Sequence, residues 1–289
     1  MSEHEYAQVP ENVPPIPDWN RLLDGRVAVV TGGGVGIGGA IARLFAQHGA
    51  HVEIAEIDPE RADATVRDIT AAGGSARAHV VDVTDADQVA AFAATVLEQH
   101  PYVSVLVNNV GDFRPASRDF GHSTPEQWQR LYELNLRHVF DTTYAVLPHL
   151  PSGASIVNVS TVEAYRGIPG HAVYSAFNAG VSAFTKSLAV ELGPRRIRVN
   201  AIAPDLADTD QTPAEAMLRG RDPELVGTWV PLGRFGQPDD YAAVVEFLTS
   251  DAARFVTGHT IPVDGGTLSA SGWYRRADGK GWTNMPDRP

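Results

Sequence analysis

The sequence predicts a doubly wound α/β fold, in which a mostly parallel sheet carries helices on both faces. Residues 27–30 are a short apolar segment, and their β-branched composition is typical of a strand buried on both faces. Residues 52–55 are expected to form a second buried strand. Between them, apolar residues such as Ile41 and Phe45 recur at helical spacing, and Gly49 is placed to end that helix. The order strand, glycine-rich turn, helix, strand is the unit from which parallel sheets are built.

The glycine-rich turn has the context of a dinucleotide-binding loop. After Thr31 the chain reads Gly32-x-x-x-Gly36-x-Gly38, directly between the first strand and the helix. Glycine accepts positive φ and lets backbone approach a ligand closely, and the N–H groups of a helix N-terminus attract phosphate. Glycines alone would be weak evidence, because many tight turns use them. Their position after a buried strand predicts that this turn binds a pyrophosphate.

Length and composition narrow the class of protein. A chain of 289 residues with 43% hydrophobic residues can bury one full core. A formal charge of −12 argues against a nucleic-acid or anionic membrane surface, and the absence of cysteine excludes disulfides and a thiolate nucleophile. No apolar segment is long enough for a membrane span, so we expect a cytoplasmic protein. The ten histidines show no paired ligand spacing, so no metal site is expected.

The segment from Thr31 to Gly38 resembles the glycine motif of the short-chain dehydrogenase/reductase family, and the resemblance covers about residues 23–268. It implies a Rossmann-like fold and hydride transfer with a nicotinamide dinucleotide. The turn residues that would contact the dinucleotide are Gly32, Gly34, Val35, Gly36, Ile37 and Gly38.

The resemblance also implies the organisation of the chain. Residues 25–268 would form the dinucleotide-binding catalytic domain, in which residues 206–230 are the substrate lid. Residues 1–24 are expected to form an extended, proline-rich arm, and residues 269–289 a tail that packs across the pocket mouth, reaches a neighbouring subunit or stays disordered. The arm would be held to the body by Trp19, Leu22 and Leu23, and the tail carries Trp273, Tyr274 and Trp282.

The acid at the end of the second strand favours NAD over NADP. Glu56 would accept hydrogen bonds from the adenosine ribose hydroxyls and repel a 2′-phosphate. Val35 stands where NADP-dependent relatives often carry a basic residue. The alternative is that Glu56 merely ends a strand in solvent. The resemblance implies further cofactor contacts from Asp82, Val83, Asn108, Gly111, Tyr174, Asn178, Pro204, Ala207 and Thr209.

Four residues occupy the family's catalytic positions. Asn135, inside a long helix expected over residues 124–150, would kink the helix and hold a relay water. Thr161 replaces the usual serine and would donate to the substrate oxygen, whereas strand alternation points Ser160 to the other face. Tyr174 would exchange the proton. The motif then departs from Tyr-x-x-x-Lys, because Asn178 stands in place of the lysine.

The loss of the lysine charge is large enough to affect function. A unit charge about 4 Å away at an effective dielectric of 20 is worth roughly 4 kcal/mol. That corresponds to about three pKa units on the tyrosine. Asn178 can still hydrogen-bond the nicotinamide ribose, but it cannot help Tyr174 to ionise.

We therefore expect an NAD-dependent oxidoreductase that interconverts a secondary alcohol and a ketone, with Thr161, Glu163 and Tyr174 facing the substrate. The rival function is an NAD-binding, catalytically impaired homologue that acts as a sensor or scaffold subunit. It rests on Asn178 and on Asp205, which replaces a family glycine near the nicotinamide. A weaker alternative is proton abstraction or dehydration by Glu163. The resemblance implies that the long helices over residues 124–150 and 172–193 pair across a twofold axis, so we expect a homodimer or homotetramer.

Overall fold

The computed structural model describes residues 18–19, 21–116, 119–272, 274–276 and 280–283. Within them, one parallel sheet has the strand order β3-β2-β1-β4-β5-β6-β7. Its strands are β1 (Val27–Thr31), β2 (His51–Glu56), β3 (Ser75–Val80), β4 (Val105–Asn108), β5 (Ser155–Val159), β6 (Arg198–Pro204) and β7 (Thr260–Val263). The strand order reverses between β1 and β4, so the predicted doubly wound α/β fold is confirmed.

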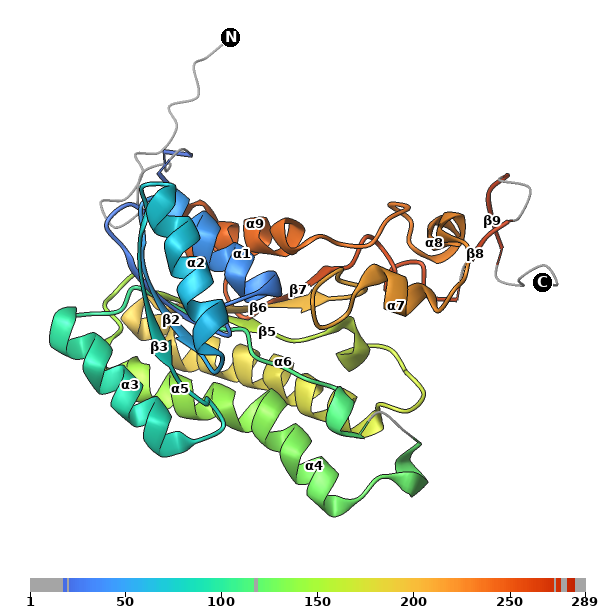
Figure 1. Cartoon of the computed structure of the whole chain (residues 1–289), viewed down its shortest axis with the longest axis horizontal. Helices are drawn as coiled ribbons and strands as arrows, with labels where there is room; N and C mark the ends of the chain where they lie inside the picture. Colours follow the sequence, from blue (N-terminus) through green and yellow to red (C-terminus); the bar gives the residue numbers. More distant parts are fainter. Residues whose placement is uncertain (1–17, 20, 117–118, 273, 277–279, 284–289) are drawn as a thin grey trace, which may run out of the picture.

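Helices cover both faces of this sheet (Figure 1). On one side lie α1 (Gly36–Gln47), α2 (Pro59–Ala71) and α9 (Pro238–Thr249), and on the other α3 (Ala86–Gln99), α5 (His138–Val146) and α6 (Ala172–Leu192). Strand alternation divides β1 between two cores: Val30 packs in the cluster with Phe45 of α1, and Val29 in the cluster with Phe92 of α3. The predicted burial of the strand on both faces is thereby confirmed.

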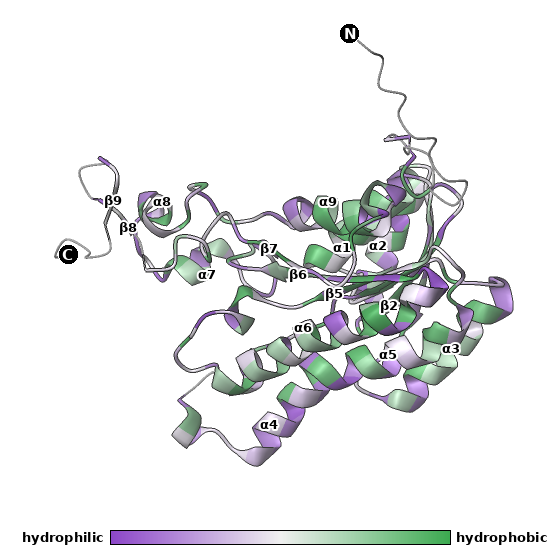
Figure 2. Ribbon diagram, turned by 180° about the vertical axis from the view of Figure 1, so that it is seen from behind, coloured by the Kyte–Doolittle hydropathy of each residue, from purple (hydrophilic) through white to green (hydrophobic). Residues whose placement is uncertain are grey.

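The helix expected over residues 124–150 is interrupted in the middle. α4 (Pro125–Tyr132) begins at a capping box formed by Thr124 and Gln127. A π-helical turn, Glu133–Arg137, joins it to α5, and a 3₁₀ turn follows α5. α4 is mostly hydrophilic, unlike the strands and α1 (Figure 2). Its outer end therefore projects from the core, and only Leu131 of α4 is buried.

The expected lid segment holds two short helices, α7 (Ala214–Leu218) and α8 (Val226–Trp229). They share a small apolar cluster with Phe235. Beside α8 lies a hairpin of β8 (Tyr274–Arg275) and β9 (Trp282–Thr283), so this part of the tail packs at the lid (Figure 1).

At the start of the chain, Leu23 is buried and Leu22 packs against the core, as expected. Trp19 is 61% exposed, so the prediction that it helps to hold the arm is wrong. The rest of the expected arm, residues 1–17, and Trp273 lie outside the described residues. No helix in the described part of the chain is both long and apolar enough to cross a membrane.

Candidate active site

A cleft of about 650 Å³ lies at the carboxyl ends of the strands, next to the point where the strand order reverses. Most residues that the sequence singled out line this cleft. They are Gly32, Val35, Gly36, Ile37, Glu56, Asp82, Val83, Gly111, Asn135, Thr161, Glu163, Tyr174, Asn178, Pro204, Ala207 and Thr209. Three others, Gly34, Gly38 and Asn108, do not line it.

The glycine turn has two kinds of glycine. Gly32 and Gly36 adopt left-handed φ values of 64° and 57°, which side chains disfavour, and both face the cleft. Gly38 instead lies where a Cβ atom would be 2.1 Å from the carbonyl oxygen of Gly32. Gly34 donates its N–H to Glu56 at 3.0 Å. Gly34 and Gly38 therefore shape the turn from behind, and the cleft wall is formed by their neighbours.

Glu56 is buried at the end of β2, so the alternative that it ends in solvent is wrong. Its carboxylate accepts hydrogen bonds from the backbone N–H groups of Gly34, Ile57 and Asp58. These bonds hold a negative charge beside Arg61 in the wall of the cleft.

The two asparagines after β4 have different positions from those expected. The side chain of Asn108 is fully buried and bonds to Thr142, Thr143 and Asn158, so it holds α5 and β5 to the sheet. Asn109 lines the cleft and donates from Nδ2 to backbone oxygens of the glycine turn. The prediction that Asn108 faces the cofactor is not supported by this placement. The length of the strand could have indicated this difference. β4 includes Asn108 as its last residue, so the side chain of Asn108 belongs to the buried strand, and Asn109 is the first residue beyond it.

Asn135 lies in the π-helical turn, which accounts for the predicted kink. Its Nδ2 donates to the backbone oxygens of Asp112 and Leu131, at 2.8 and 2.9 Å. Its Oδ1 accepts from Asp112 N–H at 3.0 Å. Both amide hydrogens are therefore occupied, and the side chain fixes the Gly111–Asp112 turn rather than offering a donor to a relay water.

Thr161 and Tyr174 both line the cleft, and their side chains are hydrogen-bonded to each other. Burial raises the pKa of Tyr174 to about 12, the hydrogen bond with Thr161 opposes this in part, and Glu163 and Asp112 add to the rise. Ser160 also lines the cleft, but its hydroxyl donates to the backbone oxygen of Asn178 at 3.1 Å. This agrees with the expectation that Ser160 and Thr161 point to opposite faces.

Asn178 is one helical turn beyond Tyr174 and is 4% exposed. Its Nδ2 donates to the backbone oxygen of Tyr174 at 3.1 Å. The side chain thus bonds within its own helix and brings no charge to the phenol.

An arginine that sequence reasoning missed, Arg166, lies beside Glu163 and Asp205. Arg166 donates to Asp205 at 2.7 Å and to Glu163 at 3.1 Å, so the acid expected near the nicotinamide is paired. Thr267 also donates to Asp205. The second oxygen of Glu163, Oε2, is buried and has no hydrogen-bond partner among the described residues. Burial raises the pKa of Glu163, and Arg166 opposes that rise.

The lid segment contacts the opposite wall. Gln211 donates to the backbone oxygen of Gly111 at 3.1 Å. Thr212 bonds to Thr209 and to the backbone oxygen of Ala207, which holds these two predicted cofactor residues in one turn. His171 lines the cleft and its ring meets Phe113 at 5.2 Å, so the loop that carries it folds inward.

A parallel sheet with a left-handed glycine turn at its switch point, and with Thr161 and Tyr174 in the same cleft, is the arrangement expected of a dinucleotide-binding α/β oxidoreductase. A family profile described as Enoyl-(Acyl carrier protein) reductase matches residues 33–267. Together with the relatives below, this shows that the chain belongs to the short-chain dehydrogenase/reductase family, as the sequence predicts. Its members bind a nicotinamide dinucleotide.

Relatives agree over most of the chain. The 3-oxoacyl-(acyl-carrier-protein) reductase FabG of Thermotoga maritima is 39% identical over 248 residues, which are 85% of this chain and 99% of that protein. A putative short-chain alcohol dehydrogenase structure from Sinorhizobium meliloti has a TM-score of 0.80 and 34% identity, covering 86% of this chain and 99% of its own. A Burkholderia cenocepacia short-chain dehydrogenase, solved with NADP, has a TM-score of 0.78, 34% identity, and coverage of 85% and 99%.

Proposed function

We propose that this protein is an NAD-dependent oxidoreductase that interconverts a secondary alcohol and a ketone by hydride transfer. The supporting observation is that one cleft joins the glycine turn and Glu56 to Thr161 and Tyr174. The left-handed glycines and buried acid suit the pyrophosphate and adenosine ribose, while Pro204, Ala207 and Thr209 would hold the carboxamide. NAD supplies the hydride acceptor or donor at C4 of its nicotinamide.

The proton chemistry rests on Tyr174. With a pKa raised to about 12, the phenol is protonated near neutral pH and can donate to a carbonyl oxygen that Thr161 holds. The reverse reaction, alcohol oxidation, requires the phenolate. Carbonyl reduction is therefore the direction that the neutral phenol serves.

The substrate would have an apolar body and one polar group. Phe113, Ile168 and Met217 line the cleft on the apolar side. Glu163 lines the same cleft, and its buried Oε2 has no hydrogen-bond partner among the described residues. A hydrophobic or cyclic ketone with a second hydrogen-bonding group fits this combination.

A second candidate, an NAD-binding homologue with little turnover, is favoured by Asn178. The side-chain amide of Asn178 donates a hydrogen bond to the backbone oxygen of Tyr174 within the same helix, and it provides no charge that would help Tyr174 to ionise. Such a protein would serve as a sensor or scaffold subunit.

A screen of ketones and alcohols with NAD(H) and NADP(H) separates the two functions, with reduced-nicotinamide absorbance as the readout. We expect turnover with NAD(H) that is lost in Tyr174→Phe while NAD affinity, measured by calorimetry, is kept. Binding of NAD without turnover of any substrate would favour the second candidate. Undiminished turnover by Tyr174→Phe would show that another group moves the proton.

The wild-type protein should bind NAD(H) at least about tenfold more tightly than NADP(H), since Glu56 repels a 2′-phosphate and Val35 offers no positive charge. Glu56→Gln should narrow this preference, because Arg61 then lies beside a neutral amide. Glu60→Gln, an exposed change in the next helix, is the control and should leave the preference intact. Calorimetric titration measures each affinity. Equal wild-type affinities would refute the role of Glu56.

We also propose a homodimer or homotetramer built on α5 and α6. Tyr144 on α5 is 82% exposed and Val190 on α6 is 80% exposed, and pairing of these helices across a twofold axis would remove both side chains from water. Tyr144→Glu with Val190→Glu should give monomers in light scattering at micromolar concentration. Val80→Glu, at a similarly exposed apolar position on β3, should leave the assembly unchanged. A monomeric wild type would contradict the proposal.

A further inference from the structure

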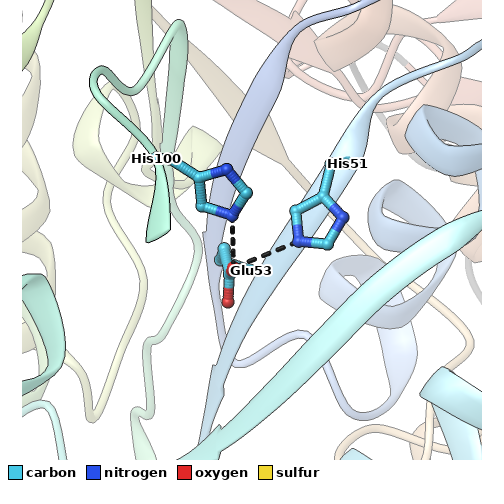
Figure 3. Close-up of side chains that lie close together, drawn as sticks. All are labelled: His51, Glu53 and His100. Carbon is cyan, nitrogen blue, oxygen red and sulfur yellow. Dashed lines mark hydrogen bonds and ion pairs between the residues drawn. The ribbon is translucent and has the colours of Figure 1, made fainter. Parts of the chain in front are cut away.

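A second cluster of chemically active side chains lies at the other end of β2 from Glu56. The carboxylate of Glu53 is fully buried, and three imidazoles surround it. On Oε1 lie Nε2 of His100 at 2.8 Å and Nε2 of His51 at 3.1 Å (Figure 3). On Oε2 lies Nε2 of His79 at 2.5 Å.

The fold alone brings these groups together. His51 and Glu53 are two residues apart in β2, so they share one face of the sheet. His79 is on the neighbouring strand β3, opposite Ala55, which puts it on the same face. His100 is the residue directly after α3, the helix that covers this face. The four residues come from three elements, which explains why the spacing of histidines in the sequence indicated no metal site.

We propose that His51, Glu53 and His100 form a binding site for a divalent transition-metal ion, with Zn²⁺ as the best fit. Imidazole nitrogen and carboxylate oxygen are common zinc ligands. One ligand atom from each of the three residues lies within 4.8 Å of the others. Tetrahedral zinc, with bonds of about 2.0–2.1 Å, needs its ligand atoms roughly 3.3 Å apart. The nitrogen-to-Oε1 separations of 3.1 and 2.8 Å are within a few tenths of an ångström of this value, and the two nitrogens lie within 4.8 Å of each other.

Neighbouring groups are arranged to orient the ligands. Nδ1 of His51 lies 2.6 Å from Oγ of Ser75. When Nε2 gives its lone pair to a metal, Nδ1 carries the ring proton and donates it to Ser75, the arrangement that metal-bound histidines generally have. His79 holds the other carboxylate oxygen, which leaves Oε1 for the ion. The side chains of His51 and His100 are 28% and 19% exposed, so an ion and a water as fourth ligand can reach the site.

The role of this site is structural. Glu53 is three residues from Glu56, about 10 Å along the strand, so the ion does not touch the cofactor cleft. It would tie β2 to the C-terminal end of α3 and so stabilise the half of the sheet that carries the adenosine contacts. Metal binding should therefore raise the melting temperature without changing NAD affinity.

The test uses untagged full-length protein, stripped with EDTA and then titrated with Zn²⁺ and, separately, with Co²⁺. We expect one equivalent of Zn²⁺, a melting temperature raised by a few degrees, and the visible absorption of tetrahedral Co²⁺. Mg²⁺, which prefers oxygen ligands, should not compete. Absence of stoichiometric uptake would overturn the proposal and leave the cluster as a hydrogen-bonded network.

Variants locate the ion. His51→Gln and His100→Gln should each weaken Zn²⁺ binding by more than about tenfold, and Ser75→Ala by about tenfold. His149→Gln removes an exposed histidine elsewhere and should bind Zn²⁺ like the wild type. NAD affinity, unchanged in every variant, shows that each one is folded. If His51→Gln and His100→Gln keep wild-type Zn²⁺ affinity, the ion sits elsewhere and the assignment fails. If either histidine variant fails to fold, the milder Ser75→Ala is the test, and wild-type Zn²⁺ affinity in Ser75→Ala would then refute the site.

Discussion

Asn178→Lys should raise the rate of alcohol oxidation near pH 7 by as much as about a thousandfold. In the wild type the pKa of Tyr174 is about 12, so about one molecule in 10⁵ carries the phenolate base at pH 7. A lysine ammonium one helical turn away would favour the charged phenol and lower its pKa by up to about three units. The acids Glu163 and Asp112, whose charges act on Tyr174, would attract the new lysine ammonium and so favour its charged form in the site.

The shape of the pH profile tests this mechanism. Because a base must be deprotonated to accept a proton, wild-type oxidation should rise with pH well past neutrality, towards the raised pKa. Asn178→Lys should move that rise to lower pH. Asn178→Met has the length of lysine without its charge and should leave the profile where it was. The rate increase will be smaller than a thousandfold, because position 178 is only 4% exposed and removing the lysine ammonium from water costs free energy.

Two outcomes would contradict this reasoning. A wild type with a neutral oxidation optimum would show that Tyr174 is not the base, and His171 and Glu163, which line the same cleft, become the next residues to replace. Equal gains from Asn178→Lys and Asn178→Met would show that side-chain length rather than charge limits the reaction. If the wild type is inactive and only the lysine variant turns over, the protein is the NAD-binding homologue described above.

Gly38→Ala should abolish measurable dinucleotide binding and destabilise the fold by about 3 kcal/mol. The added Cβ would lie 2.1 Å from the oxygen of Gly32 and 2.5 Å from Nδ2 of Asn109. Because one of these contacts is backbone, α1 must move away from the turn. That shift also displaces the N–H groups that face the pyrophosphate.

Gly39→Ala is the matched control for this change. It is the next residue of α1, and its added Cβ would meet no neighbour closer than 3.4 Å. Alanine favours the helix interior over glycine by about 1 kcal/mol, so this variant should be at least as stable as the wild type. Thermal melting and NAD titration measure both variants. Normal NAD affinity in Gly38→Ala would show that the turn tolerates the displacement.

The sequence by itself determined the fold, because the fold depends on local patterns, and the resemblance of its glycine motif to the family indicated most of the cleft residues. Alternating and continuous apolar segments predict which residues are strands, and the glycine spacing predicts the turn between β1 and α1. In a parallel sheet the strand ends meet at one edge, so the strands alone place Glu56 after β2 and Thr161 after β5 at the same edge. Tyr174 lies on α6, and only the resemblance to the family placed it beside them.

Tertiary structure decided the contacts between side chains that are far apart in the chain. Local pattern could not show that Asn108 bonds to α5 and β5 while Asn109 takes the cleft wall, nor that Arg166 neutralises Asp205 across 39 positions. The partners of Glu53 likewise lie on a neighbouring strand and at a helix end. Hydrogen bonds and hydrogen-bonded ion pairs form only when donor and acceptor lie about 3 Å apart, so their partners are set by how helices and strands pack, which no single segment encodes.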